Sequence, residues 1–196
     1  MAGGRDLWDH LAALVTYPRG DYAAAVAAAR DALAAAQPGV ESYLAALIET
    51  AKGSTIEQMQ ERFTRTFDLD PTCCPEVGWH LFGENYERGA FLVWVRAALR
   101  RAGLAETTEL PDHLVHVLPL LGRLEPEEAR AFSATCVLPA VDRMLAAFRG
   151  KDDPFEGVLR AIREVLAARF GPARDAAVPL PVMQRHNESL VLLDGE

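Results

Sequence analysis

The hydrophobic and polar positions of this chain repeat with helical spacing in nearly every segment. Apolar residues recur at i, i+3, i+4 and i+7, which is typical of helices that bury one face. The strict alternation of a β-strand is not convincing anywhere. The sequence therefore predicts an all-α fold, a single-domain bundle of about eight helices. The expected helices are 7–15, 21–36, 40–52, 54–67, 85–101, 109–122, 125–148 and 154–170, with a short element at 77–82.

Local residue choices predict details of several of these helices. Asp21 is expected to cap the second helix, and Ser54 with Glu57 has the spacing of a capping box for the fourth. Pro139 lies inside the 125–148 helix, where its missing N–H predicts a kink. The segment 85–101 is apolar on most sides, which predicts a buried helix at the centre of the bundle.

The most informative segment begins at Glu109. Glu109, Asp112, His113 and His116 follow the spacing i, i+3, i+4, i+7, so a helix would carry them on one polar face. Pro111 would occupy the first helical turn, which tolerates its missing N–H. A polar face is most often simply solvated, and that alternative stays open. The apolar face of the same helix would be formed by Leu110, Leu114, Val117, Leu118 and Leu121.

Composition and charge narrow the function classes. The chain has 196 residues, of which 50% are hydrophobic, and a formal net charge of −8. A chain of this kind folds around a core and does not bind nucleic acid nonspecifically, because such binding needs clustered Lys and Arg. It contains no run of 18 apolar residues that would span a membrane. The first residues lack the apolar centre of a signal peptide, so the cytoplasm is the expected location.

Three cysteines do not make a disulfide framework, because the count is odd and two are adjacent. Cys136 lies among apolar residues and is expected to pack in the core. Cys73 and Cys74 leave a redox or metal role open, although no supporting ligand pattern surrounds them.

The motifs of common catalytic sites are absent from the sequence. It contains no phosphate-binding loop, no dinucleotide fingerprint and no nucleophile elbow. A metal-dependent helical-bundle enzyme is the chemical alternative, but the carboxylates and histidines miss the E-x-x-H spacing of di-iron bundles. We therefore expect no catalytic residues, no metal ligands and no bound cofactor. A binding protein fits the sequence better than an enzyme.

Two neighbourhoods taken together resemble the NarJ/TorD/DmsD family of chaperones that mature molybdenum-cofactor oxidoreductases. The resemblance is strongest to the nitrate reductase assembly branch and covers roughly residues 5–170. The motifs that carry it are Phe63-x-x-x-Phe67-Asp68-Leu69-Asp70, His80-Leu81-Phe82-Gly83-Glu84, Arg88-Gly89 and Glu109-Leu110-Pro111-Asp112-His113-Leu114.

The resemblance implies a TorD-like helical domain without catalysis. It implies binding of the N-terminal peptide of a molybdoenzyme catalytic subunit, held until the cofactor is inserted. The family's acidic-histidine motif falls on Glu109, Pro111, Asp112 and His113. The apolar wall for the peptide falls on Trp79, Leu81 and Phe82.

Elementary chemistry agrees with a peptide-binding role. The apolar wall would take the apolar face of a helical leader, and the two carboxylates would take its Arg or Lys. His113 would make that contact pH-sensitive near neutrality. Arg88 would either contact the partner or pair with a nearby carboxylate such as Glu84 or Asp112. A helical adaptor without a maturation role is a further alternative, and both monomer and dimer remain open.

The end of the chain differs from the rest. Residues 173–196 carry Pro179 and Pro181 and have no helical stripe. We expect a helical domain at 1–172 and a mobile tail at 173–196, in which the apolar Val191-Leu192-Leu193 could dock in a groove.

Overall fold

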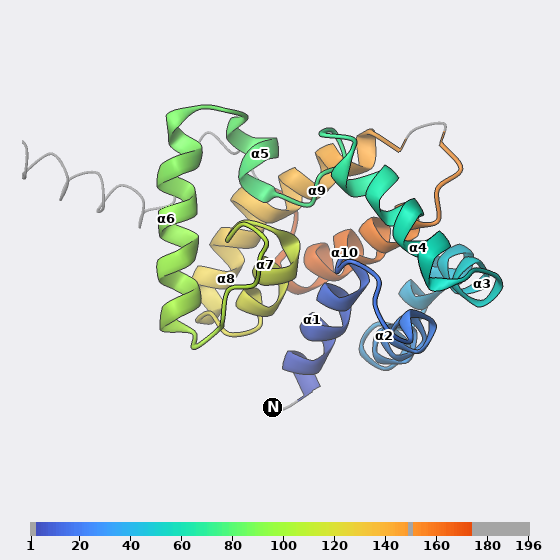
Figure 1. The fold of residues 1–196 in the computed structure, drawn as a ribbon. Coiled ribbons are helices and arrows are strands. Elements are labelled where there is room, and N and C mark those ends of the chain that lie inside the picture. Colours follow the sequence, from blue (N-terminus) through green and yellow to red (C-terminus); the bar gives the residue numbers. More distant parts are fainter. Residues whose placement is uncertain (1–2, 149–150, 174–196) are drawn as a thin grey trace, which may run out of the picture.

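A computed structural model describes residues 3–148 and 151–173, and within these ranges the chain is built from helices and connecting loops (Figure 1). The predicted all-α fold is confirmed. The α-helices are α1 (Gly3–Leu14), α2 (Tyr22–Ala36), α3 (Ala45–Gly53), α4 (Ile56–Phe63), α5 (Val77–Phe82), α6 (Tyr86–Arg101), α7 (Leu114–Leu121), α8 (Pro126–Phe132), α9 (Leu138–Ala146) and α10 (Phe155–Phe170).

Three short segments extend these helices. A 3₁₀ helix, Val40–Leu44, leads into α3, and a π-helical turn, Thr64–Asp68, continues α4. A second π-helical turn, Ser133–Val137, joins α8 to α9, so the predicted long helix exists with one irregular turn. That turn comes directly before Pro139. The missing proline N–H is therefore accommodated by a change in hydrogen-bond register of the kind that bends helices.

The helix at the centre of the bundle is α10, not α6. Helix α10 packs against α9, α1, α3 and the 3₁₀ helix, whereas α6 lies along one edge of the molecule (Figure 1). Val93 on the outer face of α6 is 51% exposed. The prediction that 85–101 is the central helix is therefore wrong. Its apolar run includes more residues than the packed face needs, and a continuous run cannot indicate which sides of a helix are covered.

Aromatic side chains fill much of the core. Phe63, Phe67 and Phe155 form one cluster, with ring centroids 4.9–5.7 Å apart, that joins α4 to α10. Trp94 is buried, and its ring meets the Phe132 ring edge-on with centroids 4.8 Å apart. These contacts hold the end of α4 and the middle of α6 against the core.

Capping explains where two helices begin. Asp21 accepts a hydrogen bond from the Ala24 N–H at 2.9 Å, as the sequence predicts for α2. At α4 the capping box is formed by Thr55 and Gln58, one residue later than predicted. Two adjacent hydroxyl residues offer the same motif in two registers, and packing of the helix selects one of them.

The described part of the chain contains no helix that is long and apolar enough to cross a membrane. The proposed tail falls almost entirely outside the described residues, since these end at 173. The mobility and docking expected for it remain predictions.

Candidate functional site

The segment that begins at Glu109 is a loop leading into α7. Helix α7 begins at Leu114, with His113 as its N-cap residue. The residue before Pro111 is disfavoured in helical backbone, which is one reason the helix does not start earlier. The predicted helix over 109–122 is therefore wrong in its first five residues. The polar face drawn on that helix does not exist, and Pro111 is not in a helical turn.

Pairing with a distant segment fixes this loop. Glu76 and His113 form an isolated antiparallel bridge. Two backbone hydrogen bonds frame it, one of 3.0 Å from Val77 N–H to Asp112 O and one of 2.8 Å from Leu114 N–H to Pro75 O. The bridge separates a buried side, which contains Asp112, from an open side, which contains Glu109.

On the buried side, Asp112 is completely buried and paired. Its Oδ2 accepts a hydrogen bond of 2.8 Å from the Gly78 N–H and lies 3.8 Å from Nε of Arg88. The same guanidinium donates to Glu76 Oε2 at 2.5 Å. Of the two alternatives for Arg88, the structure shows the ion pair, with Glu76 as the near carboxylate and Asp112 as the more distant one. Burial raises the pKa of the Asp112 carboxyl, and Arg88 acts in the opposite direction.

Gly78 allows this arrangement because it has no side chain. A Cβ placed on Gly78 would lie 2.7 Å from Asp112 Oδ2 and 2.8 Å from Cδ1 of Phe91. These distances are shorter than real Cβ contacts allow, so α5 could not approach the loop as closely with any other residue at this position.

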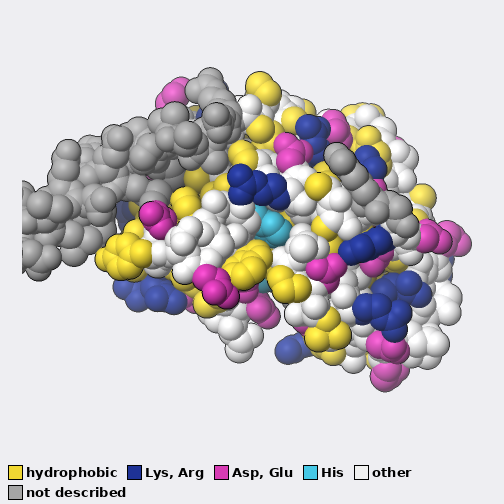
Figure 2. All heavy atoms as spheres, turned by 90° about the horizontal axis from the view of Figure 1, so that it is seen from above, with side chains coloured by type: hydrophobic (Ala, Val, Ile, Leu, Met, Phe, Trp, Pro, Cys, Tyr) yellow, Lys and Arg dark blue, Asp and Glu magenta, His cyan; other side chains and the backbone are white. Residues whose placement is uncertain are grey.

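The aromatic residues of α5 lie on the buried side of the bridge. Trp79, Leu81 and Phe82 are half-buried. The Arg88 guanidinium lies 5.5 Å from the centre of the Trp79 ring, and Phe82 packs on Phe91 at 5.5 Å. The face that carries α5 shows a histidine among basic and hydrophobic side chains, without a patch of a single charge (Figure 2).

Backbone groups hold both histidines of the segment in place. His113 Nδ1 accepts from the Val115 N–H at 3.0 Å, and burial lowers the pKa of His113 to about 3, with a smaller contribution from His116. His116 Nε2 accepts from the Thr107 N–H at 2.9 Å, so its Nδ1 is the atom that donates to Leu110 O. The expectation that His113 titrates near neutrality is therefore wrong.

On the open side, a hollow of about 290 Å³ lies between the loop, the end of α1 and α4. The exposed Glu109 carboxylate has no hydrogen-bond or ion-pair partner among the described residues. The lining combines apolar and charged side chains: Val15, Tyr17, Arg19, Phe63, Asp68, Glu109 and His113.

The structure thus divides the predicted peptide-binding residues into two groups. Glu109 and His113 line the hollow. The buried group, on the other side of the bridge, does not line it and consists of the buried Asp112 and the half-buried Trp79, Leu81, Phe82 and Arg88. Pro111 is buried in the loop between the groups.

Sequence reasoning named none of the far-wall residues, Tyr17, Arg19 and Asp68, as peptide-binding residues, although Asp68 lies in a motif that carries the resemblance. The aromatic residue before the helix-ending Pro18 is the one local signal that could have indicated Tyr17.

The adjacent cysteines lie near the bridge but are poorly suited to thiol chemistry. Cys73 is buried and Cys74 is half-buried. Burial raises the pKa of Cys74 to about 11, and His80 Nε2 lies 2.7 Å from the Cys74 carbonyl oxygen. A thiol with a raised pKa stays protonated near neutrality, and the thiolate is the reactive form. Cys136 is buried in the core, as predicted.

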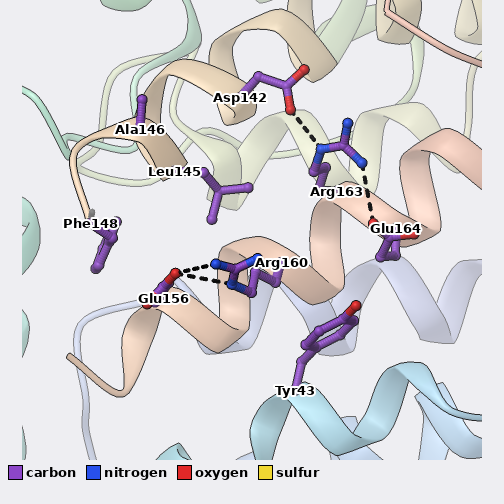
Figure 3. Close-up of a pocket in the computed structure, with 9 residues that line it drawn as sticks. All are labelled: Tyr43, Asp142, Leu145, Ala146, Phe148, Glu156, Arg160, Arg163 and Glu164. Carbon is purple, nitrogen blue, oxygen red and sulfur yellow. Dashed lines mark hydrogen bonds and ion pairs between the residues drawn. The ribbon is translucent and has the colours of Figure 1, made fainter. Parts of the chain in front are cut away.

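A larger hollow, of about 500 Å³, lies between α9 and α10 (Figure 3). Arg160 faces Glu156 there, with a closest distance of 2.6 Å, and Arg163 Nε lies 2.7 Å from Asp142 Oδ1. Both guanidiniums are thus already paired with carboxylates. This hollow is a weaker candidate than the one beside Glu109.

Comparisons with known proteins agree with the fold and with the sequence motifs. The family model of the nitrate reductase delta subunit matches residues 22–160. A solved structure described as a redox enzyme maturation protein from Archaeoglobus fulgidus superimposes with a TM-score of 0.57 at 21% identity. The match covers 83% of this chain and 93% of that one, and it shows a shared fold. No relative among the curated proteins matches the chain.

Proposed function

Because this chain belongs to the nitrate reductase delta subunit family, we propose that it binds the N-terminal peptide of a molybdenum-cofactor oxidoreductase catalytic subunit. The client is nitrate reductase or a relative, and the chaperone holds the apoenzyme while the cofactor is inserted and the subunits assemble. Family membership supports the general role, system-specific maturation of a molybdoenzyme. The site geometry supports the peptide and its location.

The observation that carries this proposal is the hollow beside Glu109. An unpaired carboxylate stands at the edge of a concave surface whose walls include Tyr17 and Phe63. An amphipathic leader fits such a surface, because its apolar side chains can pack on the aromatic rings while Arg or Lys pairs with the carboxylate. His113, neutral near pH 7, adds a polar wall without adding a competing positive charge.

The buried group has a different role in this proposal. Glu76 holds the Arg88 guanidinium, which lies beside Asp112, and Asp112 accepts a hydrogen bond from the Gly78 N–H at the start of α5. These residues position the loop that carries Glu109. Trp79 stays a candidate peptide contact, because its side chain and that of the adjacent Arg88 are both only half-buried.

Calorimetry tests the proposal with synthetic leader peptides of the molybdenum-cofactor oxidoreductase catalytic subunits encoded in the same genome. At least one peptide should bind. Glu109→Gln should weaken binding roughly 10- to 100-fold, the equivalent of a lost charge-assisted hydrogen bond. Glu125→Gln is the matched control, because Glu125 is exposed and does not line the hollow.

The outcomes decide where the peptide binds and whether it binds at all. Loss of affinity in Trp79→Ala, with Glu109→Gln unchanged, would move the peptide to the α5 face. Absence of binding by every leader would refute the proposed peptide recognition. Purification of a cofactor-poor catalytic subunit with the chain would separate a maturation chaperone from an adaptor without that role.

A further inference from the structure

A second hollow, of about 390 Å³, adjoins the one beside Glu109. Tyr17 lines both hollows, so the two meet at this side chain. Helix α4 and its π-helical turn form a wall along both, since Phe63 and Asp68 face the first hollow and Gln60 and Thr64 face the second. The two hollows therefore follow one side of a single helical rod.

The position of Tyr17 is fixed by contacts with that rod. Its ring meets the Phe63 ring edge-on, with centroids 5.7 Å apart. The Gln60 side chain donates a hydrogen bond of 2.8 Å to the carbonyl oxygen of Pro18 and holds the end of the α1 loop on α4. Tyr17 is half-buried. The Tyr17 side chain therefore stands in a fixed position between the two hollows. A chain bound in either hollow would contact it.

The far hollow ends at an exposed apolar residue. Leu69 lines this hollow and is 73% exposed, so its side chain is accessible to a partner. It directly follows the π-helical turn, and its N–H closes that turn on the Thr64 carbonyl at 3.0 Å. Such π-helical turns occur often at functional sites, which makes this turn a second indication of binding along the rod.

The charge of the combined lining favours a basic partner. Four carboxylates belong to it, those of Glu57, Glu61, Asp68 and Glu109. Two guanidiniums oppose them, Arg19 and Arg65, and Arg65 already pairs with Glu61 at 2.8 Å. The lining is therefore two charges negative.

We propose that the two hollows form one binding surface for a basic amphipathic segment, with Tyr17 at its middle and Leu69 as its second apolar anchor. This inference rests on the proposed function and extends it, because the occupant is the continuation of the leader held at Glu109. Helix α4 with its π-helical turn spans residues 56–68. A leader helix of about the same length, roughly 20 Å, would lie along it.

The test uses the leader peptide that binds in the preceding experiment, in full length and shortened from the end that leaves the Glu109 hollow. Leu69→Ser should weaken the full-length peptide about fivefold, because an apolar contact is lost. The same substitution should leave the shortened peptide unaffected. Val93→Ser is the control, since Val93 is also exposed and apolar but lies on α6.

The outcomes separate this inference from the proposed function. Unchanged affinity in Leu69→Ser, with a clear loss in Glu109→Gln, overturns the extended surface and leaves the Glu109 site standing. Equal losses in Leu69→Ser and Val93→Ser also overturn it, because the effect would not be local. No effect in either Glu109→Gln or Leu69→Ser refutes both sites.

Discussion

The two sides of the Glu76–His113 bridge place similar residue types in opposite environments. Asp112 is fully buried and paired, whereas Glu109, three residues earlier, is exposed and lines a hollow. A buried carboxylate without hydrogen-bond donors destabilises the folded protein. An exposed carboxylate keeps its hydration and can exchange bound water for a partner. One acidic motif therefore contains a residue that shapes the site and a residue that can bind.

The comparison also shows why an unbroken polar stripe was the wrong picture. A stripe on a helix would present both carboxylates to the same ligand. The bridge turns Asp112 towards α5 and Arg88 instead. Substitutions on the two sides should therefore separate stability from binding, and the following predictions test that separation.

The largest expected effect is on stability, from Asp112→Ala. This change leaves Arg88 without one carboxylate and the Gly78 N–H without its acceptor, in a buried place. The buried Gly78 N–H loses its acceptor and Arg88 keeps only Glu76, which together cost about 2–4 kcal/mol. Urea denaturation should show this loss in the free energy of unfolding. Glu109→Ala should stay within about 0.5 kcal/mol of the parent, as exposed substitutions do. Equal stabilities of the two variants would contradict the contrast.

A smaller loss of stability is expected from Gly78→Ala. The new methyl group would press on Asp112 Oδ2 and on the Phe91 ring, and overpacking of this kind costs about 1–3 kcal/mol. Gly89→Ala is the matched control on α6, because a Cβ there meets nothing within 4 Å. It should raise stability by about 0.5–1 kcal/mol, the usual helix preference for Ala. Thermal denaturation of both variants decides whether the close approach of α5 is real.

Helical periodicity predicted most of the fold because packing itself requires that periodicity. Helix α10 has its buried residues at the spacing that the sequence shows, and Asp21 caps α2 by a contact within three residues. The loop before α7 was not predictable in the same way. Its backbone is fixed by Gly78 and its neighbours, 34 residues earlier in the chain, and periodicity carries no information on such a pairing.

The candidate site was predictable only in part, because some of its residues come together through contacts that are distant in sequence. The family resemblance pointed to Glu109 and His113, and both of these residues line the hollow. Asp68 belongs to a motif of the resemblance, but nothing in that motif shows that it faces Glu109. Tyr17 reaches the hollow only through the packing of the loop after α1 on α4. Gly78 lies in the short predicted element 77–82 without any local signal, and its importance appears only when Asp112 is in place beside it.

The smallest expected effect concerns pH. Burial lowers the pKa of His113 from 6.5 to about 3, so between these values the unfolded chain binds a proton that the folded chain does not. Stability should therefore fall as the pH is lowered below about 6.5, by about 1 kcal/mol between pH 7 and 5.5. His113→Asn keeps an N-cap acceptor for the Val115 N–H and removes this titration, so its stability should depend less on pH.

Part of the pH dependence should remain in that variant, because burial also lowers the pKa of His80. Urea denaturation at both pH values measures the difference between parent and His113→Asn. An identical pH dependence in the two proteins would show that His113 is hydrated in the folded chain. Water in the hollow beside Glu109 would then hydrate this ring, and the sharp division between the buried and the open side would be lost.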